Sequence, residues 1–147
     1  MKIAIIGDVK TPARATPLAA GIDFFVPNDF VSPHYLIAGQ SVLIASGIKA
    51  KIPKGFMLYA ANKSGVAVKM GLSVGACVVG EDFEGEIFMH VVNTGDKVAE
   101  IKAGAKLVQF ILVPVSYEAV EVVEELELLG PEVSQRGGGS LGSSGTD

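Results

Sequence analysis

Cationic and hydroxyl-bearing residues stand beside glycines at two places in the chain, and such groups bind anions. Lys63 precedes Ser64 and Gly65 at a possible helix start, where an ammonium, a hydroxyl and backbone amides would converge on one ligand. Arg136 precedes a run of glycines and serines whose amides can wrap a phosphate. Gln109 offers an uncharged amide donor. Taken singly, Lys63 and Gln109 would be ordinary surface side chains; together these groups favour a site for a small phosphate-bearing molecule.

The elements that must position these side chains are short apolar runs, broken at near-regular intervals by Gly, Pro, Asn and Asp. That punctuation is typical of a many-stranded β domain. Turn residues mark several reversals, among them residues 37–40, 52–55 and 93–96. The number of runs suits a closed barrel or a sandwich. The expected strands are residues 2–6, 23–26, 34–37, 40–44, 47–52, 55–60, 72–74, 76–79, 86–93, 97–101 and 106–115.

One short helix is expected at residues 64–70, where Ser64 is a candidate N-cap although the valines there disfavour a helix. Residues 113–129 are acidic enough for a helix, but the alternation of side chains in 119–123 favours a further strand. Beyond Pro131 the composition changes to glycine and serine, which predicts a flexible arm. We therefore expect a β domain over residues 1–130 and a glycine-rich arm over 131–147.

The overall composition excludes several classes of protein. The chain has 147 residues, a net charge of −4 and one cysteine, which fits a single domain and rules out a disulfide scaffold. With two histidines there is no zinc-module spacing. The acidic balance argues against broad binding of DNA or RNA. The N-terminal apolar run is too short for a signal sequence, and no stretch approaches the ~18 apolar residues of a membrane span, so the expected location is cytoplasmic.

Five segments, spread over nearly the whole chain, carry recognisable sequences. They read AAGID at residues 19–23, KSGVA at 63–67, ACVVGEDFEGEI at 76–87, GAKLVQF at 104–110 and RGGGSLGSSG at 136–145. This series resembles the conserved motifs of the trimeric dUTP diphosphatase (dUTPase) family. Each segment alone is a weak signal, but five of them in order at the right separations are specific.

The resemblance implies an all-β fold, a distorted antiparallel jelly-roll-like β-barrel of the dUTPase type with at most one short helix. It also implies a homotrimer with three active sites at subunit interfaces, the arm of one chain closing over a pocket built by the other two. The ligand would be a deoxyribonucleoside triphosphate, with Mg²⁺ held through the triphosphate and waters and not by direct protein ligands. Direct contact with nucleic acid or a membrane is not expected.

The site residues implied by the resemblance form two groups. The phosphate-binding group comprises Lys63, Ser64, Gly65, Gln109, Arg136, Gly142, Ser143 and Ser144. The second group would contact the base and the deoxyribose, in part through backbone groups of a β-hairpin around the third motif, and comprises Cys77, Val78, Val79, Phe83, Ile87, Met89 and Leu141. Lys63 stands where the family usually has arginine, so it would hold a phosphate more loosely than the planar guanidinium does.

The main departure from the family pattern is Gly80, which stands where the family has its catalytic aspartate. In the family that carboxylate activates the water that attacks the α-phosphorus and expels pyrophosphate. Base assistance of this kind is worth ~10²–10⁴ in rate, so another group must take the role if activity is retained. The candidates are Asp82, Glu81 and Asp23. Asp82 lies on the same side of an extended segment as residue 80, whereas Glu81 has the longer side chain.

The leading interpretation is Mg²⁺-dependent hydrolysis of dUTP to dUMP and pyrophosphate, which limits uracil in DNA and supplies dUMP for thymidylate synthesis. Changes near the base and the reacting phosphorus, at Cys77, Gly80, Phe83 and Leu141, leave open a pyrophosphatase that prefers dTTP, dCTP or a modified base. A dCTP deaminase is disfavoured because its glutamate-bearing and arginine-rich motifs are not seen. The third hypothesis, which follows from Gly80, is a catalytically weak trimer that binds dUTP in a regulatory role.

Overall fold

The computed structural model describes residues 1–129, and the chain divides into two units. The first unit, Met1–Ser116, contains the eleven described strands and helix α1 (Ser64–Met70). The second unit begins at Tyr117, and its described part contains helix α2 (Glu125–Leu129). Among the described residues, no helix is long and apolar enough to cross a membrane.

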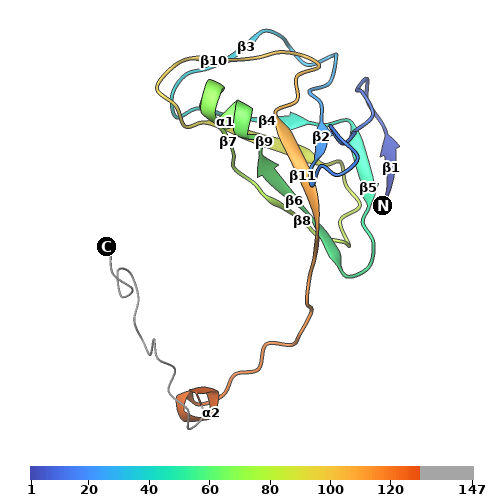
Figure 1. The fold of residues 1–147 in the computed structure, drawn as a ribbon, viewed down its shortest axis with the longest axis vertical. Helices are drawn as coiled ribbons and strands as arrows, with labels where there is room; N and C mark the ends of the chain where they lie inside the picture. The colour runs from blue at the N-terminus through green and yellow to red at the C-terminus, as the bar shows by residue number, and fades with distance from the viewer. Residues whose placement is uncertain (130–147) are drawn as a thin grey trace. The chain divides into compact units, whose positions relative to one another are not determined.

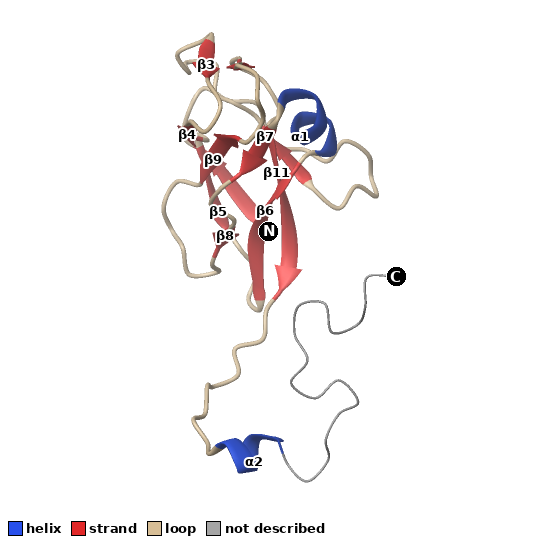
Figure 2. Cartoon of the chain, turned by 90° about the vertical axis from the view of Figure 1, so that its left-hand side faces the viewer, coloured by secondary structure: helices blue, strands red, loops and turns tan. Residues whose placement is uncertain are grey.

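Short strands make up nearly all the regular structure of the first unit (Figures 1 and 2). In chain order they are β1 (Lys2–Ile5), β2 (Ile22–Phe24), β3 (His34–Leu36), β4 (Ser41–Ala45), β5 (Ile48–Lys51), β6 (Phe56–Asn62), β7 (Leu72–Val74), β8 (Val78–Val79), β9 (Phe88–Asn93), β10 (Ala99–Ile101) and β11 (Val108–Pro114). Each overlaps a run expected from the sequence, and α1 has the expected bounds. The all-β class with one short helix in this unit is therefore confirmed.

The strands form four antiparallel groups, ordered β1-β5, β10-β3, β2-β11-β6-β8 and β4-β9-β7. Strands remote in the sequence are neighbours in these groups, as β2 is of β11 and β3 is of β10. The chain therefore wraps around the interior before its last strands close the structure, as in a jelly roll.

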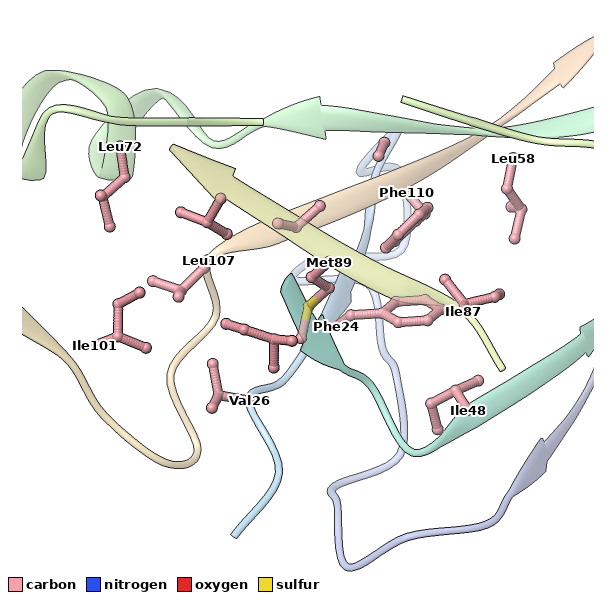
Figure 3. Packing of buried hydrophobic residues seen from close by; sticks show 14 of the residues in the cluster. Phe24, Val26, Ile48, Leu58, Leu72, Ile87, Met89, Ile101, Leu107 and Phe110 are labelled. Carbon is pink, nitrogen blue, oxygen red and sulfur yellow. The ribbon is translucent and has the colours of Figure 1, made fainter. Parts of the chain in front are cut away.

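Alternate residues of the longer strands point into one interior, because side chains of a strand alternate between its two faces. Leu58 of β6 and Phe110 of β11 are fully buried, whereas Tyr59, between Leu58 and the next inward residue, is 40% exposed. The rings of Phe24 and Phe110 pack at 4.4 Å between centroids. Figure 3 shows Phe24, Met89 and Phe110 pointing into this shared core. Burial of each such side chain contributes ~1.5–3 kcal/mol.

Helix α1 is delimited by backbone geometry and not by a side-chain cap. Its N-cap is Lys63, with no side-chain hydrogen bond, so the expectation that Ser64 caps the helix was wrong. The helix ends at Met70 and its C-cap is Gly71, whose left-handed φ of 66° is accessible to glycine at little cost. A β-carbon on Gly71 would lie 2.8 Å from the Cα of Gly95, so the loop after β9 packs directly against the end of the helix.

The strand expected at residues 119–123 is not formed, and that expectation was wrong. These residues have no regular structure, and α2 follows them as a second short helix outside the first unit. Val120 and Val122 are each 94% exposed. Alternating apolar residues stabilise a strand only where one of its faces packs on something, and these valines lack such packing within the described residues.

Candidate active site

Asp23 and Gln109 are direct partners across two antiparallel strands. In the register of β2 and β11 they face each other, and Ala61 of β6 faces Gln109 from the other side. The chain leaves β6 at Asn62 and enters α1 through Lys63. Residues of the first, second and fourth motifs, which are far apart in the sequence, therefore meet at one end of the β2-β11-β6-β8 sheet.

The Asp23 carboxylate lies beneath two lysines. Its side chain is only 5% exposed; the Lys63 ammonium pairs with Oδ1, and the Lys106 ammonium lies 3.5 Å from Oδ2. A buried carboxylate needs such partners, because taking a charge out of water is costly. Two ammonium groups against one carboxylate leave one net positive charge at this end of the sheet. That charge favours a bound anion.

Gln109 is held in place by the backbone of β6. Its Nε2 donates a hydrogen bond to the Asn62 carbonyl oxygen at 2.8 Å. The side chain of Asn62 in turn accepts a hydrogen bond from the Val74 amide at 2.7 Å. The Gln109 carboxamide is thereby fixed beside Lys63, at the junction of β11, β6 and β7.

The amides of Ser64 and Gly65 open helix α1 next to this charge, and both residues are exposed. The next two amides, of Val66 and Ala67, already donate to the Lys63 carbonyl oxygen at 2.9 Å. The first amides of a helix have no acceptor within it. Those of Ser64 and Gly65 are thus directed outward beside Lys63, where they suit a phosphate oxygen.

Two residues of this site escaped the sequence analysis. Lys106 is the second partner of Asp23; it lies within the fourth segment, so a signal was present. Arg14 donates from Nη1 to the carbonyl oxygens of Ala19 and Ala20, the latter at 2.6 Å, and thereby fixes the loop before Asp23. No pattern in the sequence marks Arg14 for this role.

The third segment lies farther along β6. Val78 and Val79 of β8 pair with Tyr59 and Leu58, and the Ala60 amide donates to the Cys77 carbonyl oxygen at 2.6 Å. From Leu58 to Lys63 is five residues, or about 16 Å at the ~3.3 Å rise of a strand. Gly80 follows Val79 away from Lys63. The residues around Gly80 are therefore well separated from Asp23, Lys63 and Gln109 of the same chain.

The third segment lies between β7 and β9, which pair antiparallel, and the Gly75 amide extends this pairing by donating to the His90 carbonyl oxygen at 3.0 Å. Within the segment, strand β8 pairs with β6. Ile87 and Met89 are 1% and 0% exposed, so their side chains belong to the core. The Ile87 amide and carbonyl oxygen are engaged as well, with Ile48 at 2.9 Å and Ser46 at 3.1 Å. Phe83 is 43% exposed and borders a shallow hollow of ≈ 310 Å³ beside β1 and β5.

A family model described as dUTPase matches residues 8–145. The chain belongs to the dUTPase family. A deoxyuridine 5'-triphosphate nucleotidohydrolase of Candida glabrata is 38% identical over 135 residues, which cover 91% of this chain and 88% of that protein. The mouse protein of the same name is 33% identical over 135 residues, covering 91% and 77%.

Solved dUTPase structures have the same fold. The dUTPase of Staphylococcus bacteriophage 80alpha with dUpNHpp superposes with a TM-score of 0.83 over 98% of this chain and 97% of that one, at 20% identity. The dUTPase from phage phi11 of S. aureus gives a TM-score of 0.74 over 86% and 97%, also at 20% identity. This likeness supports the jelly-roll-like dUTPase fold inferred above.

Part of the dUTPase pattern lies outside the described residues, namely Arg136, Leu141, Gly142, Ser143 and Ser144. Within residues 1–129, no group of three or more His, Cys, Asp or Glu side chains is placed to hold a metal ion.

A cleft of ≈ 880 Å³ lies between α1 and residues 94–107. Its lining includes Lys106, the partner of Asp23, but none of the site residues expected from the sequence. The other charged residues of this lining are Lys69, Asp96, Lys97, Glu100 and Lys102.

Proposed function

We propose that this protein hydrolyses dUTP to dUMP and pyrophosphate. The observation that carries the proposal is the cluster of Asp23, Lys63 and Gln109, which joins three dUTPase motifs and leaves one net positive charge beside two outward-facing amides. Relatives named deoxyuridine 5'-triphosphate nucleotidohydrolase support the choice of substrate. Such an enzyme would limit uracil in DNA and supply dUMP for thymidylate synthesis. The proposal includes a cytoplasmic location.

In this proposal the triphosphate binds where β2, β11 and α1 meet. Lys63 supplies charge, Gln109 a neutral donor, and the Ser64 and Gly65 backbone amides bind phosphate oxygens. The Ser64 hydroxyl is exposed beside them. The arm completes the set with further phosphate donors and one apolar side chain over the base: Arg136, Gly142, Ser143, Ser144 and Leu141.

The base and the deoxyribose would contact the third motif. Backbone groups of Cys77, Val78 and Val79 are proposed to pair with uracil, with main-chain groups at Met89 as a further candidate. The exposed Phe83 ring would pack on the sugar, an arrangement that crowds out a ribose 2′-hydroxyl. The Cys77 thiol, half-buried and 3.5 Å from the Gly75 carbonyl oxygen, would line this region without reacting.

A complete site would need more than one copy of the chain. Along β6 the order is Lys63, then the base-contacting Cys77–Val79 segment, then the residues around Gly80. Along dUTP the order is different, because the α-phosphorus lies between the other phosphates and the sugar. One chain therefore does not place the residues around Gly80 next to a phosphate bound at Lys63. This mismatch supports a homotrimer in which different copies supply the two halves of each interface site.

Mg²⁺ is proposed as the cofactor. Both Asp23 oxygens already have lysine partners, so this carboxylate does not suit direct metal coordination. The arrangement fits Mg²⁺ held by the triphosphate and by waters, as this ion prefers. When bound, the ion would neutralise phosphate charge and orient the chain of phosphates. The structure of a phi11 dUTPase variant is described as coordinating a structural Mg(II) ion, which is a property of that protein.

The proposal is tested with the purified full-length chain and Mg²⁺. We expect pyrophosphate release from dUTP and little from dTTP, dCTP or UTP. Turnover of another nucleotide in preference to dUTP would establish a different pyrimidine preference and contradict the proposal. Tight binding of dUTP without turnover would instead indicate a regulatory protein. The imido analogue dUpNHpp measures binding separately from chemistry in each case.

A further inference from the structure

The Asp82 carboxylate lies directly beside the place where a side chain of residue 80 would begin. Residues 80–83 form a turn, with the Phe83 amide donating to the Gly80 carbonyl oxygen at 3.2 Å. A β-carbon placed on Gly80 would lie 2.9 Å from Asp82 Oδ1. The turn thus folds the Asp82 side chain back over Gly80, into the space that a longer residue at position 80 would use.

The other two candidate carboxylates are committed elsewhere. Glu81 Oε2 accepts a hydrogen bond from the Gly55 amide at 2.5 Å, in the turn between β5 and β6. Asp23 has a lysine partner on each oxygen. A carboxylate oxygen that is held by such a partner has less room to accept a hydrogen bond from an attacking water.

Asp82 is differently placed. Its side chain is exposed, and within residues 1–129 its carboxylate has neither an ion pair nor a side-chain hydrogen bond. Both oxygens are therefore free to accept a hydrogen bond from the water molecule that attacks the phosphate.

We propose that Asp82 is the general base of this dUTPase, in place of an aspartate at position 80. This inference rests on the proposed hydrolysis of dUTP. The water oxygen forms a bond to the α-phosphorus while the bond from that phosphorus to the bridging oxygen breaks. Pyrophosphate leaves with the electron pair, and the water proton passes to the Asp82 carboxylate. Gly80 is part of the same arrangement, since any β-carbon there would press on Asp82 Oδ1.

The primary test is the Asp82→Asn variant, with Glu84→Gln as a matched control that also neutralises an exposed carboxylate of the same turn region. We expect kcat for dUTP to fall by ~10²–10⁴ in Asp82→Asn, with the Kd for dUpNHpp within about threefold of the unmodified protein. Glu84→Gln should retain both values. An Asp82→Asn variant that keeps its kcat, or that loses dUpNHpp binding together with kcat, would overturn the assignment.

A second variant moves the carboxylate two residues back, from position 82 to position 80. Gly80→Asp combined with Asp82→Ala, which clears the space beside residue 80, should have a kcat at least about tenfold above that of Asp82→Asn. A double variant as inactive as Asp82→Asn would contradict the shared position. The unmodified chain separates the two proposals: if it does not hydrolyse dUTP, the proposed function fails, whereas unchanged turnover in Asp82→Asn removes only the role of Asp82.

Discussion

Gly21 lies so close to Gln109 that a β-carbon on Gly21 would approach Oε1 to 2.0 Å and Cδ to 2.6 Å. Gly21 is buried and precedes β2, whereas Gln109 is in the middle of the candidate site. The absence of a side chain in the first motif therefore creates the space in which the amide of the fourth motif stands.

The first prediction follows from this contact. Gly21→Ala should displace the Gln109 carboxamide and break its hydrogen bond to Asn62, because the side chain must rotate away from the new methyl group. We expect dUpNHpp to bind roughly 3- to 10-fold more weakly, the effect of one neutral hydrogen bond. Calorimetric titration measures the change. Gln109→Ala should weaken binding to a similar degree, and unchanged affinity in both variants would exclude Gln109 from phosphate binding.

The second prediction concerns the charge of Lys63. Lys63→Met should weaken dUpNHpp binding roughly 10- to 100-fold, because a charge-assisted contact to phosphate is lost. Lys63→Arg should bind at least as tightly as the natural lysine, since a guanidinium can make two parallel hydrogen bonds. The control is Lys102→Met, which removes an exposed lysine paired with Glu100 at 3.0 Å. Equal weakening in Lys63→Met and Lys102→Met would point to a general charge effect.

The third prediction concerns the space above Gly80. Gly80→Ala adds no charge and has no left-handed φ to strain, but its methyl group would displace the Asp82 carboxylate. We expect kcat to fall about tenfold if proton transfer depends on that position. Steady-state kinetics with dUTP gives the value. A fully active Gly80→Ala enzyme would show that the placement of Asp82 over Gly80 is not needed.

The fourth prediction concerns stability. Asn93 is completely buried, and its Nδ2 donates to the carbonyl oxygens of Leu36 and Lys97, each at 2.8 Å. Asn93→Ala leaves these acceptors unpaired and should lower the free energy of unfolding by about 2–4 kcal/mol. Urea denaturation measures it. Asn28→Ala is the control, because Asn28 is exposed and makes one side-chain bond, to Asp8 at 3.0 Å; its effect should stay below about 1 kcal/mol.

The fifth prediction tests whether two copies share a site. Lys63→Met alters the residue that joins β6 to α1, whereas Phe83→Ala alters a residue of the turn that follows β8. If one copy supplies Lys63 and another supplies Phe83, mixed oligomers of the two variants contain some sites with neither change. Co-expression should then give more dUTP turnover than either variant alone. Additive residual activity, with no gain on mixing, would place both residues of a site in one chain.

The sequence was sufficient to predict the strands and the helix α1, because short apolar runs between glycines and prolines leave little choice of local structure. It was not sufficient to predict which strands pair. The separation of Gly80 from Lys63 depends on the register of β8 on β6, and a register between remote strands is set by packing and not by local spacing.

Within the candidate site, residue types indicated anion binding at Lys63 and Gln109, but not the partners that hold them. Lys106 lies in the fourth motif, but the sequence did not indicate its role as a partner of Asp23, because that role depends on the pairing of β2 with β11. The error at residues 119–123 has a related cause. The alternation of Val120, Glu121 and Val122 is typical of a strand with one buried face. It does not indicate whether another element covers that face, and in the structure both valines are exposed.

The junction of Gly71 with Gly95 has a consequence for α1 as a whole. Two amides, of Thr94 and Gly95, donate to the Gly71 carbonyl oxygen at 2.8 and 3.1 Å, and the Thr94 hydroxyl donates to the same oxygen at 3.1 Å, so the loop after β9 anchors the end of the helix. The helix is about 10 Å long at 1.5 Å per residue, and its opposite end presents Ser64 and Gly65. A side chain at position 95 would press on the Gly71 backbone and change the orientation of α1. The Ser64 and Gly65 amides would then point away from the phosphate, and the affinity for phosphate would fall although no residue near the phosphate had been changed.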